Sequence, residues 1–459
     1  MLHQDRLFPT NTDERAIAKR LFETVCNLPL ICPHGHTDPT WFAQNEAFAN
    51  PTELLVVPDH YVLRMLVSQG IPLARFRDGE GDPQELWKLF ADHYYLFRGT
   101  PTQIWLDHTF RETFGLEVRL SAATADLYYA RISDCLSKDE FRPRALFDSF
   151  KIEVIATTEP VNDPLTHHKD IANSDWTGRV ITAYRPDSVV DPEFDGFLDN
   201  LAEFGEISGE DIGTWEGYLN AHRIRRAYFA AHGATSTDHG HPTAKTANLS
   251  RVEAEALYAV VSSGTSDAAQ NEMFRAQMLT EMAGMSVEDG LVMQLHPGSH
   301  RNHNADMFEQ FGRDIGFDIP QRTSYVDALK PLLDCHGMDP RLSLILFTLD
   351  ESTYARELAP LAGVYPSLKL GPAWWFFDSA AGMMRYRELV TETAGFYNTV
   401  GFNDDTRALP SIPARHDVAR RVDCAYLARL VATHVMAEEG AVEVAHELAY
   451  GLAKAAYKL

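Results

Sequence analysis

Leu28-Pro29-Leu30-Ile31-Cys32-Pro33-His34-Gly35-His36-Thr37-Asp38-Pro39 combines a short apolar run with two closely spaced histidines. The run from 28 to 32 predicts a buried strand, and the Asp-Pro pair would end the extended segment. In an extended chain, residues i and i+2 point the same way, so His34 and His36 would face one side. Two neutral imidazoles on one side can bind a divalent metal. This stretch therefore predicts a metal site just past the first strand.

A second His-x-His motif, His239-Gly240-His241, weakens any argument from the motif alone. The chain has 19 histidines, so about one such motif is expected by chance and the structural context has to decide. The second copy lies between Asp238 and Pro242, without a long apolar run before it. We therefore interpret it as a pair of solvated loop histidines.

The charge balance limits the classes of partner. The chain of 459 residues has 65 acidic and 41 basic side chains, which gives a formal net charge of −24. Such a surface repels nucleic acid and anionic membranes, so neither is an expected partner. Binding of an anionic substrate would depend on a local cluster of arginines. The sequence shows no apolar signal segment and no apolar run of membrane-spanning length.

The cysteines indicate a reducing compartment. Their number is odd, they are far apart, and none forms a Cys-x-x-Cys pair: Cys26, Cys32, Cys135, Cys335 and Cys424. This pattern is typical of reduced thiols and not of a disulfide framework or a zinc ribbon. We therefore expect a cytoplasmic protein.

The first third of the chain is predicted to be mostly helical. Residues 11–26 have three possible capping residues, Asn11, Thr12 and Asp13, and the apolar spacing of an amphipathic helix. Residues 60–145 are rich in aromatic side chains at helical spacing, and we interpret them as a helical insertion after the first strand. The predicted organisation is therefore an N-terminal helix and first barrel strand (1–59), the helical insertion (60–145) and the remainder of the barrel (146–459).

From about residue 151, short apolar runs alternate with helix-like stretches. Seven runs follow the first strand, at 151–156, 180–184, 233–237, 291–295, 342–347, 368–370 and 399–402, and the third of these is weak. Strands that alternate with helices indicate a parallel sheet, and eight strands suggest a closed, TIM-like (β/α)8 barrel. In such a barrel, the residues after the strand ends gather at one mouth, where catalysis takes place. The polar residues expected there are His34, His36, Arg185, Asp238, His296, Asp405 and Arg407.

Two histidines and an aspartate form the predicted metal site. His34, His36 and Asp405 offer two nitrogens and one oxygen, and they leave positions open for substrate or water. Zn²⁺ is the first expectation, and Mn²⁺, Fe²⁺ or Co²⁺ would also fit. No lysine follows the fourth strand, where a dinuclear site would need a bridging carboxylated lysine, so a single metal is the simpler interpretation. His296 is a third candidate imidazole, and its alternative role is that of a hydrogen-bonded core residue.

Two arginines at predicted strand ends suit recognition of an anionic group. The guanidinium groups of Arg185 and Arg407 can each bind a carboxylate or phosphate through two hydrogen bonds. The alternative is a structural salt bridge, with Asp187 for Arg185 and with Asp404 or Asp405 for Arg407. The chain has no glycine-rich phosphate loop, so a carboxylate is the expected ligand.

Taken in order, these motifs resemble the uronate isomerases (glucuronate isomerases), a divergent branch of the amidohydrolase superfamily. The matching segments run almost from end to end. They are Pro33-His34-Gly35-His36, Asp59-His60-Tyr61, Thr157-Thr158, Arg185-Pro186-Asp187, Asp238-His239-Gly240, Met293-Gln294-Leu295-His296 with Arg301-Asn302, Ala373-Trp374-Trp375-Phe376, and Asp405-Thr406-Arg407 with Ser411, Arg415 and His416.

The resemblance implies an aldose–ketose isomerisation of hexuronates through an enediolate, as part of hexuronate catabolism. The implied reactions convert D-glucuronate to D-fructuronate and D-galacturonate to D-tagaturonate. The implied metal ligands are His34, His36 and Asp405, and the implied catalytic residues are Asp405, His60, Tyr61 and His34. The substrate would be contacted by Arg185, Asp238, His296, Arg407 and Trp374, although packing is the more usual role of an aromatic run such as 374–377.

Two segments depart from the family pattern. Pro58 replaces the usual glycine before Asp-His-Tyr, and Glu159 and Pro160 follow the Thr-Thr pair where the family has Asp-Asp-Pro. These departures affect the shape of loops and would alter the preference between uronates, but they remove no predicted ligand.

Two other classes of function remain open from the residues alone. A mononuclear hydrolase, such as a lactonase or deaminase, would use the same metal to activate water. A non-catalytic sugar-acid-binding protein would bind uronate without turnover. The strand-end arginines and the His60-Tyr61 pair favour an acidic polyol as the ligand. A homo-oligomer is the expected assembly.

Overall fold

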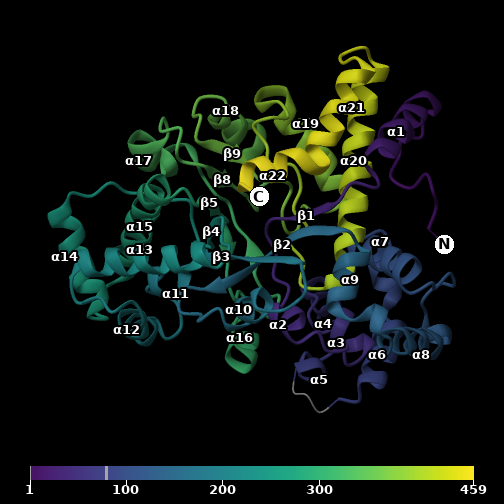
Figure 1. The fold of residues 1–459 in the computed structure, drawn as a ribbon, viewed down its shortest axis with the longest axis horizontal. Coiled ribbons are helices and arrows are strands. Elements are labelled where there is room, and N and C mark those ends of the chain that lie inside the picture. Colours follow the sequence, from purple (N-terminus) through teal and green to yellow (C-terminus); the bar gives the residue numbers. More distant parts are fainter. Residues whose placement is uncertain (1, 78–80) are drawn as a thin grey trace.

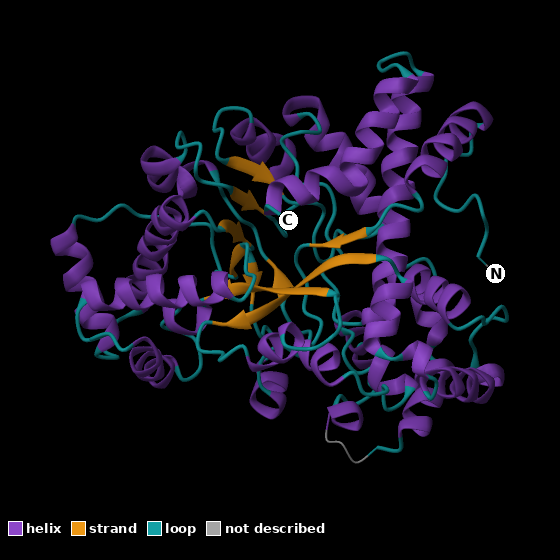
Figure 2. Ribbon diagram, viewed as in Figure 1, coloured by secondary structure: helices purple, strands orange, loops and turns teal. Residues whose placement is uncertain are grey.

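Seven strands form one parallel sheet at the centre of the molecule, and helices surround it (Figure 2). The computed structural model describes residues 2–77 and 81–459. The strands, in their order across the sheet, are β1 (Leu30–Cys32), β2 (Ile152–Pro160), β3 (Arg179–Arg185), β4 (Ser236–His239), β5 (Val292–Leu295), β8 (Leu344–Leu346) and β9 (Leu368–Leu370). Most of their side chains are buried, as expected for parallel strands covered by helices. The predicted α/β class and parallel sheet are confirmed.

Helices connect the parallel strands. They are α10 (Thr166–Ala172), α11 (Asp187–Val190), α12 (Phe197–Ser208), α13 (Trp215–Ala231), α14 (Arg251–Ser262), α15 (Ala268–Asp289), α17 (Val326–His336), a short helical segment Tyr354–Leu358, α18 (Ala359–Ala362) and α19 (Ala380–Ala394). Local sequence sets the bounds of α15. Asp267 and Gln270 form a capping box at its start, and Gly290, with a φ of +79°, ends it.

The eighth predicted run, 399–402, forms no strand in the described structure. It makes one parallel bridge, between Leu370 and Thr399, and the Val400 amide donates to the Leu370 carbonyl at 3.1 Å. Gly401 has a φ of +75°, which turns the backbone out of the extended conformation directly after this bridge. The main sheet among the described residues therefore has seven strands, not the eight predicted.

Strand β4 is displaced from the weak run that predicted it. The run covered 233–237, whereas β4 spans Ser236–His239. Gly233, with a φ of +97°, lies outside the strand. Because β4 extends further, it carries His239 into the core, and the side chains of His239 and His241 are only 0% and 4% exposed. The interpretation of the second His-x-His motif as solvated loop residues is therefore wrong.

The described residues between β1 and β2 form helices and no strand. They are α2 (Pro39–Gln44), α3 (Pro51–Leu55), α4 (His60–Val67), α5 (Ala74–Arg77), α6 (Pro83–Asp92), α7 (Pro101–His108), α8 (Ala125–Leu136) and α9 (Pro143–Ser149), with shorter helical turns at Tyr94–Phe97, Thr109–Thr113, Ala122–Thr124 and Asp139–Phe141. Their apolar side chains form a separate cluster around Trp87, whose indole nitrogen donates to the Ala125 carbonyl at 3.1 Å. Helices begin at Pro39, earlier than the predicted 60, and the domain boundaries stay predictions.

The first helix packs against helices of the C-terminal part of the chain at one side of the sheet (Figure 1). The helices involved are α1 (Thr12–Val25), α20 (Ile412–Ala432), α21 (Glu438–His446) and α22 (Leu452–Tyr457), with short turns at Leu409–Ser411 and Glu447–Gly451. Asn11, one of the three possible caps, is the residue that caps α1. Arg420 of α20 donates to the Leu28 and Pro29 carbonyls at 3.0 and 2.9 Å, just before β1. No described helix combines the length and apolar composition needed to cross a membrane.

A small two-stranded element, which the sequence did not predict, projects after β5. Its strands β6 (Ser299–His300) and β7 (Ile319–Pro320) are antiparallel. The segment between them contains α16 (Ala305–Phe311), near the lower edge of Figure 1. We call residues 301–318 the flap.

Candidate active site

The carboxyl ends of the strands open into a cavity of about 530 Å³. All ten predicted site residues line it: His34, His36, His60, Tyr61, Arg185, Asp238, His296, Trp374, Asp405 and Arg407. The structure thus brings together side chains that are spread over most of the sequence. Their individual roles stay predictions.

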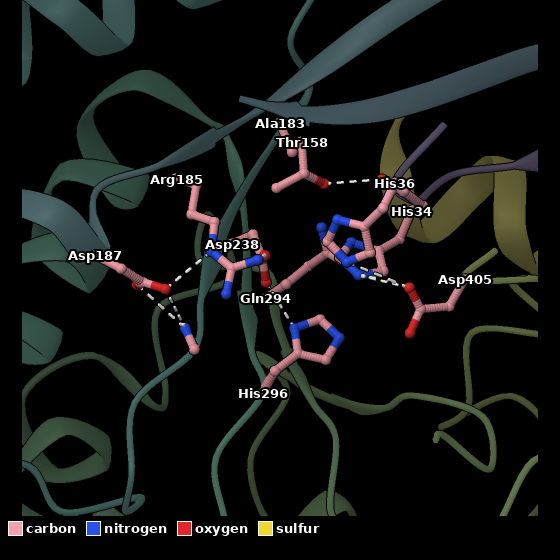
Figure 3. Close-up of polar contacts among 12 residues, drawn as sticks. His34, His36, Thr158, Ala183, Arg185, Asp187, Asp238, Gln294, His296 and Asp405 are labelled. Atoms are coloured by element: carbon pink, nitrogen blue, oxygen red, sulfur yellow. Dashed lines mark hydrogen bonds and ion pairs between the residues drawn. The ribbon is translucent and has the colours of Figure 1, made fainter. Parts of the chain in front are cut away.

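Three of these residues face one another beside β1 (Figure 3). The Asp405 Oδ1 atom lies 3.6 Å from His34 Nε2 and 3.5 Å from His36 Nε2. The Trp374 indole nitrogen donates to the other Asp405 oxygen, Oδ2, at 2.8 Å. The His36 amide donates to the Thr406 carbonyl at 3.1 Å, which joins the segment after β1 to the segment that carries Asp405.

The backbone at Asp405 is strained. Its φ is +42°, a left-handed conformation that few residues other than glycine adopt. The Trp374 hydrogen bond and the His36–Thr406 contact hold the segment in place. Such strain persists where the surrounding structure imposes it, which is common at functional sites.

The donor set fits a divalent metal ion. The ligand atoms of His34, His36 and Asp405 lie within 4.8 Å of one another, and His34, Asp238 and His296 form an overlapping group. Buried polar atoms normally have hydrogen-bond partners, yet His34 Nδ1, His296 Nε2 and Asp405 Oδ1 have none. Two imidazoles and a carboxylate form a ligand set that transition metals accept.

The protonation states of these side chains also suit metal binding. Burial lowers the pKa of His36 to about 3 in spite of the nearby Asp405 carboxylate. Burial alone would raise the pKa of Asp405, but the adjacent His34 and His36 outweigh it and lower this pKa to about 2. Near neutral pH the carboxylate is therefore ionised and the His36 imidazole is neutral, as metal ligands must be.

A second chain of polar contacts runs from β5 to β3. His296 Nδ1 lies 2.7 Å from Asp238 Oδ1, and Arg185 Nη1 lies 3.2 Å from Asp238 Oδ2. Burial would raise the pKa of Asp238, but Arg185 and His296 hold it well below its usual range. The His296 ring stacks on Phe347, with ring centroids 3.9 Å apart. These contacts fix the His296 ring and leave its Nε2 atom without a protein partner.

The start of α4 places His60 and Tyr61 at the cavity. Asp59 caps the helix by accepting from the Tyr61 and Val62 amides. The Tyr61 hydroxyl donates to Asp378 at 2.8 Å and accepts from the Phe376 amide at 2.8 Å. Burial lowers the pKa of His60 to about 4, so its imidazole is neutral near pH 7.

The two strand-end arginines have different partners. Arg185 contacts Asp187 at 2.9 Å, which is the salt bridge considered from the sequence, and it also contacts Asp238. Arg407 pairs with Asp314 of the flap at 2.5 Å, and not with Asp404 or Asp405. The expected partners for Arg407 are therefore wrong, since its side chain contacts the flap instead.

Several lining residues had no sequence signal. Asp314 and Asp378 line the cavity and contact Arg407 and Tyr61, respectively. Both depend on contacts between segments far apart in the chain, so no local motif could indicate them. Glu159 also lines the cavity, and the sequence had marked it only as a departure from the family pattern.

Glu159 makes stability depend on pH. Its side chain is buried and accepts hydrogen bonds from Thr157 and Thr182. Burial raises its pKa from 4.5 to about 7 in spite of these bonds. The folded protein therefore retains a proton that the unfolded chain loses above its pKa of 4.5. The contribution of this proton to the free energy of unfolding is present at lower pH and is lost as pH rises towards 7.

We expect Glu159→Gln to remove this pH dependence. Between pH 4.5 and 7.5, the free energy of unfolding should fall further in the wild type than in the variant, by up to about 3 kcal/mol. Urea unfolding at several pH values measures the difference. Glu443→Gln, at an exposed position of α21, is the matched control. Parallel pH curves for the wild type and Glu159→Gln would contradict the prediction.

Comparisons with known proteins cover the whole chain. The model of a family described as glucuronate isomerase matches residues 7–457. The uronate isomerase of Rhizorhabdus wittichii is 62% identical over 459 residues, which cover 100% of this chain and 98% of the relative. The crystal structure of glucuronate isomerase from Caulobacter crescentus matches with a TM-score of 0.99 at 59% identity, over 100% of this chain and 97% of that chain. The uronate isomerase of Thermotoga maritima matches with a TM-score of 0.94 at 26% identity, over 100% of this chain and 99% of that chain. The chain therefore belongs to the glucuronate isomerase family.

Proposed function

We propose that the chain catalyses the aldose–ketose isomerisation of hexuronates, D-glucuronate to D-fructuronate and D-galacturonate to D-tagaturonate. The observation that carries this proposal is a single cavity that combines a His-His-Asp group with the guanidinium groups of Arg185 and Arg407. A sugar acid has both the polyol and the carboxylate that such a cavity can recognise. The relatives named uronate isomerase support the same reaction.

Substrate binding relies on the charged and aromatic lining. Arg185 and Arg407 bind anionic oxygens of the uronate, its carboxylate and the developing enediolate. Asp238 and His296 hydrogen-bond to sugar hydroxyls, since the His296 Nε2 atom has no partner in the protein. Trp374 forms part of the wall, and its hydrogen bond fixes the orientation of the Asp405 carboxylate.

The reaction moves protons without net change in composition. The carbon-bound proton of C2 moves to C1. The C2 hydroxyl loses its proton and the C1 oxygen gains one, and an enediolate forms between the two states. Asp405, ionised near neutral pH, accepts the C2 proton directly or through a water that it orients, and the proton is returned to C1. His60, which is neutral, relays hydroxyl protons during ring opening. Tyr61 assists only after its hydrogen bond to Asp378 is exchanged for one to the sugar.

His34, His36 and Asp405 would hold a single divalent cation, and we propose Zn²⁺. When bound there, such a cation supplies a Lewis acid that stabilises negative charge on a substrate oxygen. His34 would contribute to catalysis as a ligand of this cation. Phe347 and Trp374 pack against the His296 ring, and Phe347 also lies near the His34 ring.

The test is incubation of the purified protein with D-glucuronate and with D-galacturonate, followed by NMR. We expect 2-keto products from one or both sugars, and a fall in rate of at least about tenfold after chelation that added Zn²⁺ restores. Metal analysis before and after chelation is the control. If metal-loaded protein forms no keto-uronate but hydrolyses a lactone, the isomerase proposal is wrong and the hydrolase takes its place.

We further propose that residues 399–406 close the sheet into a barrel in place of an eighth strand. The bridge between Leu370 and Thr399 on one side, and the hydrogen bond from His36 to Thr406 on the other, support this arrangement. Residues 60–145 would then be the helical insertion in that barrel.

A cytoplasmic location is also a proposal, supported by five free cysteine thiols. A homo-oligomer is proposed on the basis of the protein class alone. Light scattering of the purified protein would give its assembly state.

A further inference from the structure

Each arginine that the described structure places in the cavity wall is already paired with a carboxylate of the chain. The pairs are Arg185 with Asp187 and Asp238, Arg301 with Asp318, Arg313 with Asp195, Arg407 with Asp314, and Arg415 with Asp378. An anionic substrate therefore meets no guanidinium without a partner. To bind an arginine fully, the substrate has to displace a protein carboxylate or share the arginine with it.

The Arg407–Asp314 pair is the best suited for displacement. Its side chains are 34% and 53% exposed, whereas those of Arg415 and Asp378 are 8% and 12% exposed. The contact joins one guanidinium nitrogen to one carboxylate oxygen, so a single hydrogen bond has to be broken to release the arginine. Arg313 is also partly exposed, but its partner Asp195 lies outside the cavity lining. Arg407 follows Asp405 by two positions and lies close enough to His36 and His60 to lower the pKa of each.

The flap holds Asp314 over Arg407 by its backbone geometry. Asp314 has a φ of +60°, and it lies between Gly312 and Gly316, which have φ values of +77° and +92°. At Gly316 the flap backbone approaches His60 so closely that a Cβ atom there would lie 3.0 Å from the His60 Cβ. These contacts place a carboxylate next to the arginine that the proposed function assigns to an anionic oxygen of the substrate.

The surroundings keep Asp314 ionised. The nearby Arg407, with His60 and His36, holds the pKa of the Asp314 carboxyl below its usual range. The adjacent Arg313 pairs with Asp195 at 2.6 Å, and its guanidinium lies 4.2 Å from the ring centroid of Phe194, which lines the cavity. Two neighbouring residues of the flap thus form ion pairs with two different segments of the chain.

We propose that Asp314 is a positioning residue that occupies Arg407 in the free enzyme and yields this arginine to an anionic oxygen of the bound sugar acid. The inference rests on the proposed function for the identity of the ligand. Asp314 keeps Arg407 extended across the mouth while the cavity is empty. It also makes binding selective, because a neutral aldose offers no charge in exchange for the broken ion pair.

The test is Asp314→Asn, which removes the charge and keeps the shape. Binding of D-gluconate, a sugar acid without a carbonyl to isomerise, is measured by calorimetry, and KM is measured with D-glucuronate. We expect the dissociation constant of gluconate and the KM for glucuronate each to fall by about three- to fivefold. This is the size expected for loss of a partly exposed ion pair. We expect KM to change more than kcat.

Two further variants separate this role from a general loosening of the flap. Arg313→Met also breaks the ion pair between the flap and Asp195 but frees no guanidinium, so it should not raise gluconate affinity. In an Arg407→Met background, Asp314→Asn should no longer change gluconate affinity. Unchanged or weaker binding by Asp314→Asn, or an equal gain in Arg313→Met, would overturn the proposal. Calorimetry needs no turnover, so a wild type that binds gluconate but forms no keto-uronate would contradict the proposed function alone.

Discussion

Replacing Asp405 with alanine should lower kcat/KM for D-glucuronate by at least about 10³-fold, the largest effect we expect on activity. Loss of a proton-transfer group alone typically costs about 10²- to 10⁴-fold. Asp405 is also the oxygen ligand of the proposed metal site, so its removal leaves only His34 and His36 in the group. The two losses act on the same reaction step, and we expect them to combine.

Two measurements separate these effects. Product formation followed by NMR gives kcat/KM, and elemental analysis gives the metal content of each variant. Asp405→Asn keeps the side-chain oxygen and the shape but loses the charge, so it should retain more metal than Asp405→Ala while remaining almost inactive. Asp334→Asn, an exposed aspartate on α17, is the matched control. Activity of Asp405→Ala within tenfold of the wild type would remove Asp405 from both roles.

The largest expected effect on stability follows from Arg415→Met. The Arg415 guanidinium donates to Asp378 at 3.0 Å and to the Asp404 carbonyl at 3.1 Å, and it stacks 3.8 Å above the Trp105 ring. Methionine would leave the buried Asp378 carboxylate without its cation. Removing one partner of a buried ion pair typically costs about 3 to 5 kcal/mol. We expect a loss of this size in the free energy of unfolding, measured with urea.

A double variant tests the cause of this loss. Arg415→Met combined with Asp378→Asn removes both charges, so it should recover part of the lost stability. Arg341→Met breaks an exposed pair with Asp339 and should change stability by less than about 1 kcal/mol. If the double variant were no more stable than Arg415→Met, the unpaired carboxylate would not be the source of the loss.

Features that depend on local sequence could be predicted. The first strand, the strand-end placement of His34 and His36, and the Asn11 cap of the first helix each follow from residues within a few positions of one another. The convergence of distant residues such as Arg185 and His296 also follows, because parallel strands point their carboxyl ends to one edge of the sheet.

Features that depend on tertiary contacts could not be predicted. The eighth run ends after one bridge because Gly401 adopts a positive φ, which its residue type permits but does not require. The burial of His239 depends on where β4 begins. The partner of Arg407 is Asp314, 93 positions away on a flap whose short strands have no pattern of their own.

The packing of α20 against the segment before β1 has a consequence for synthesis on the ribosome. Arg420 reaches back across 392 positions to the Leu28 carbonyl. At about 5 to 20 residues per second, roughly 20 to 80 s pass between the emergence of these two groups. During that interval β1 and its two histidines lack both α20 and Asp405. The nascent chain thus carries an unfinished sheet edge until translation is nearly complete, and the catalytic cavity is among the last parts of the molecule to form.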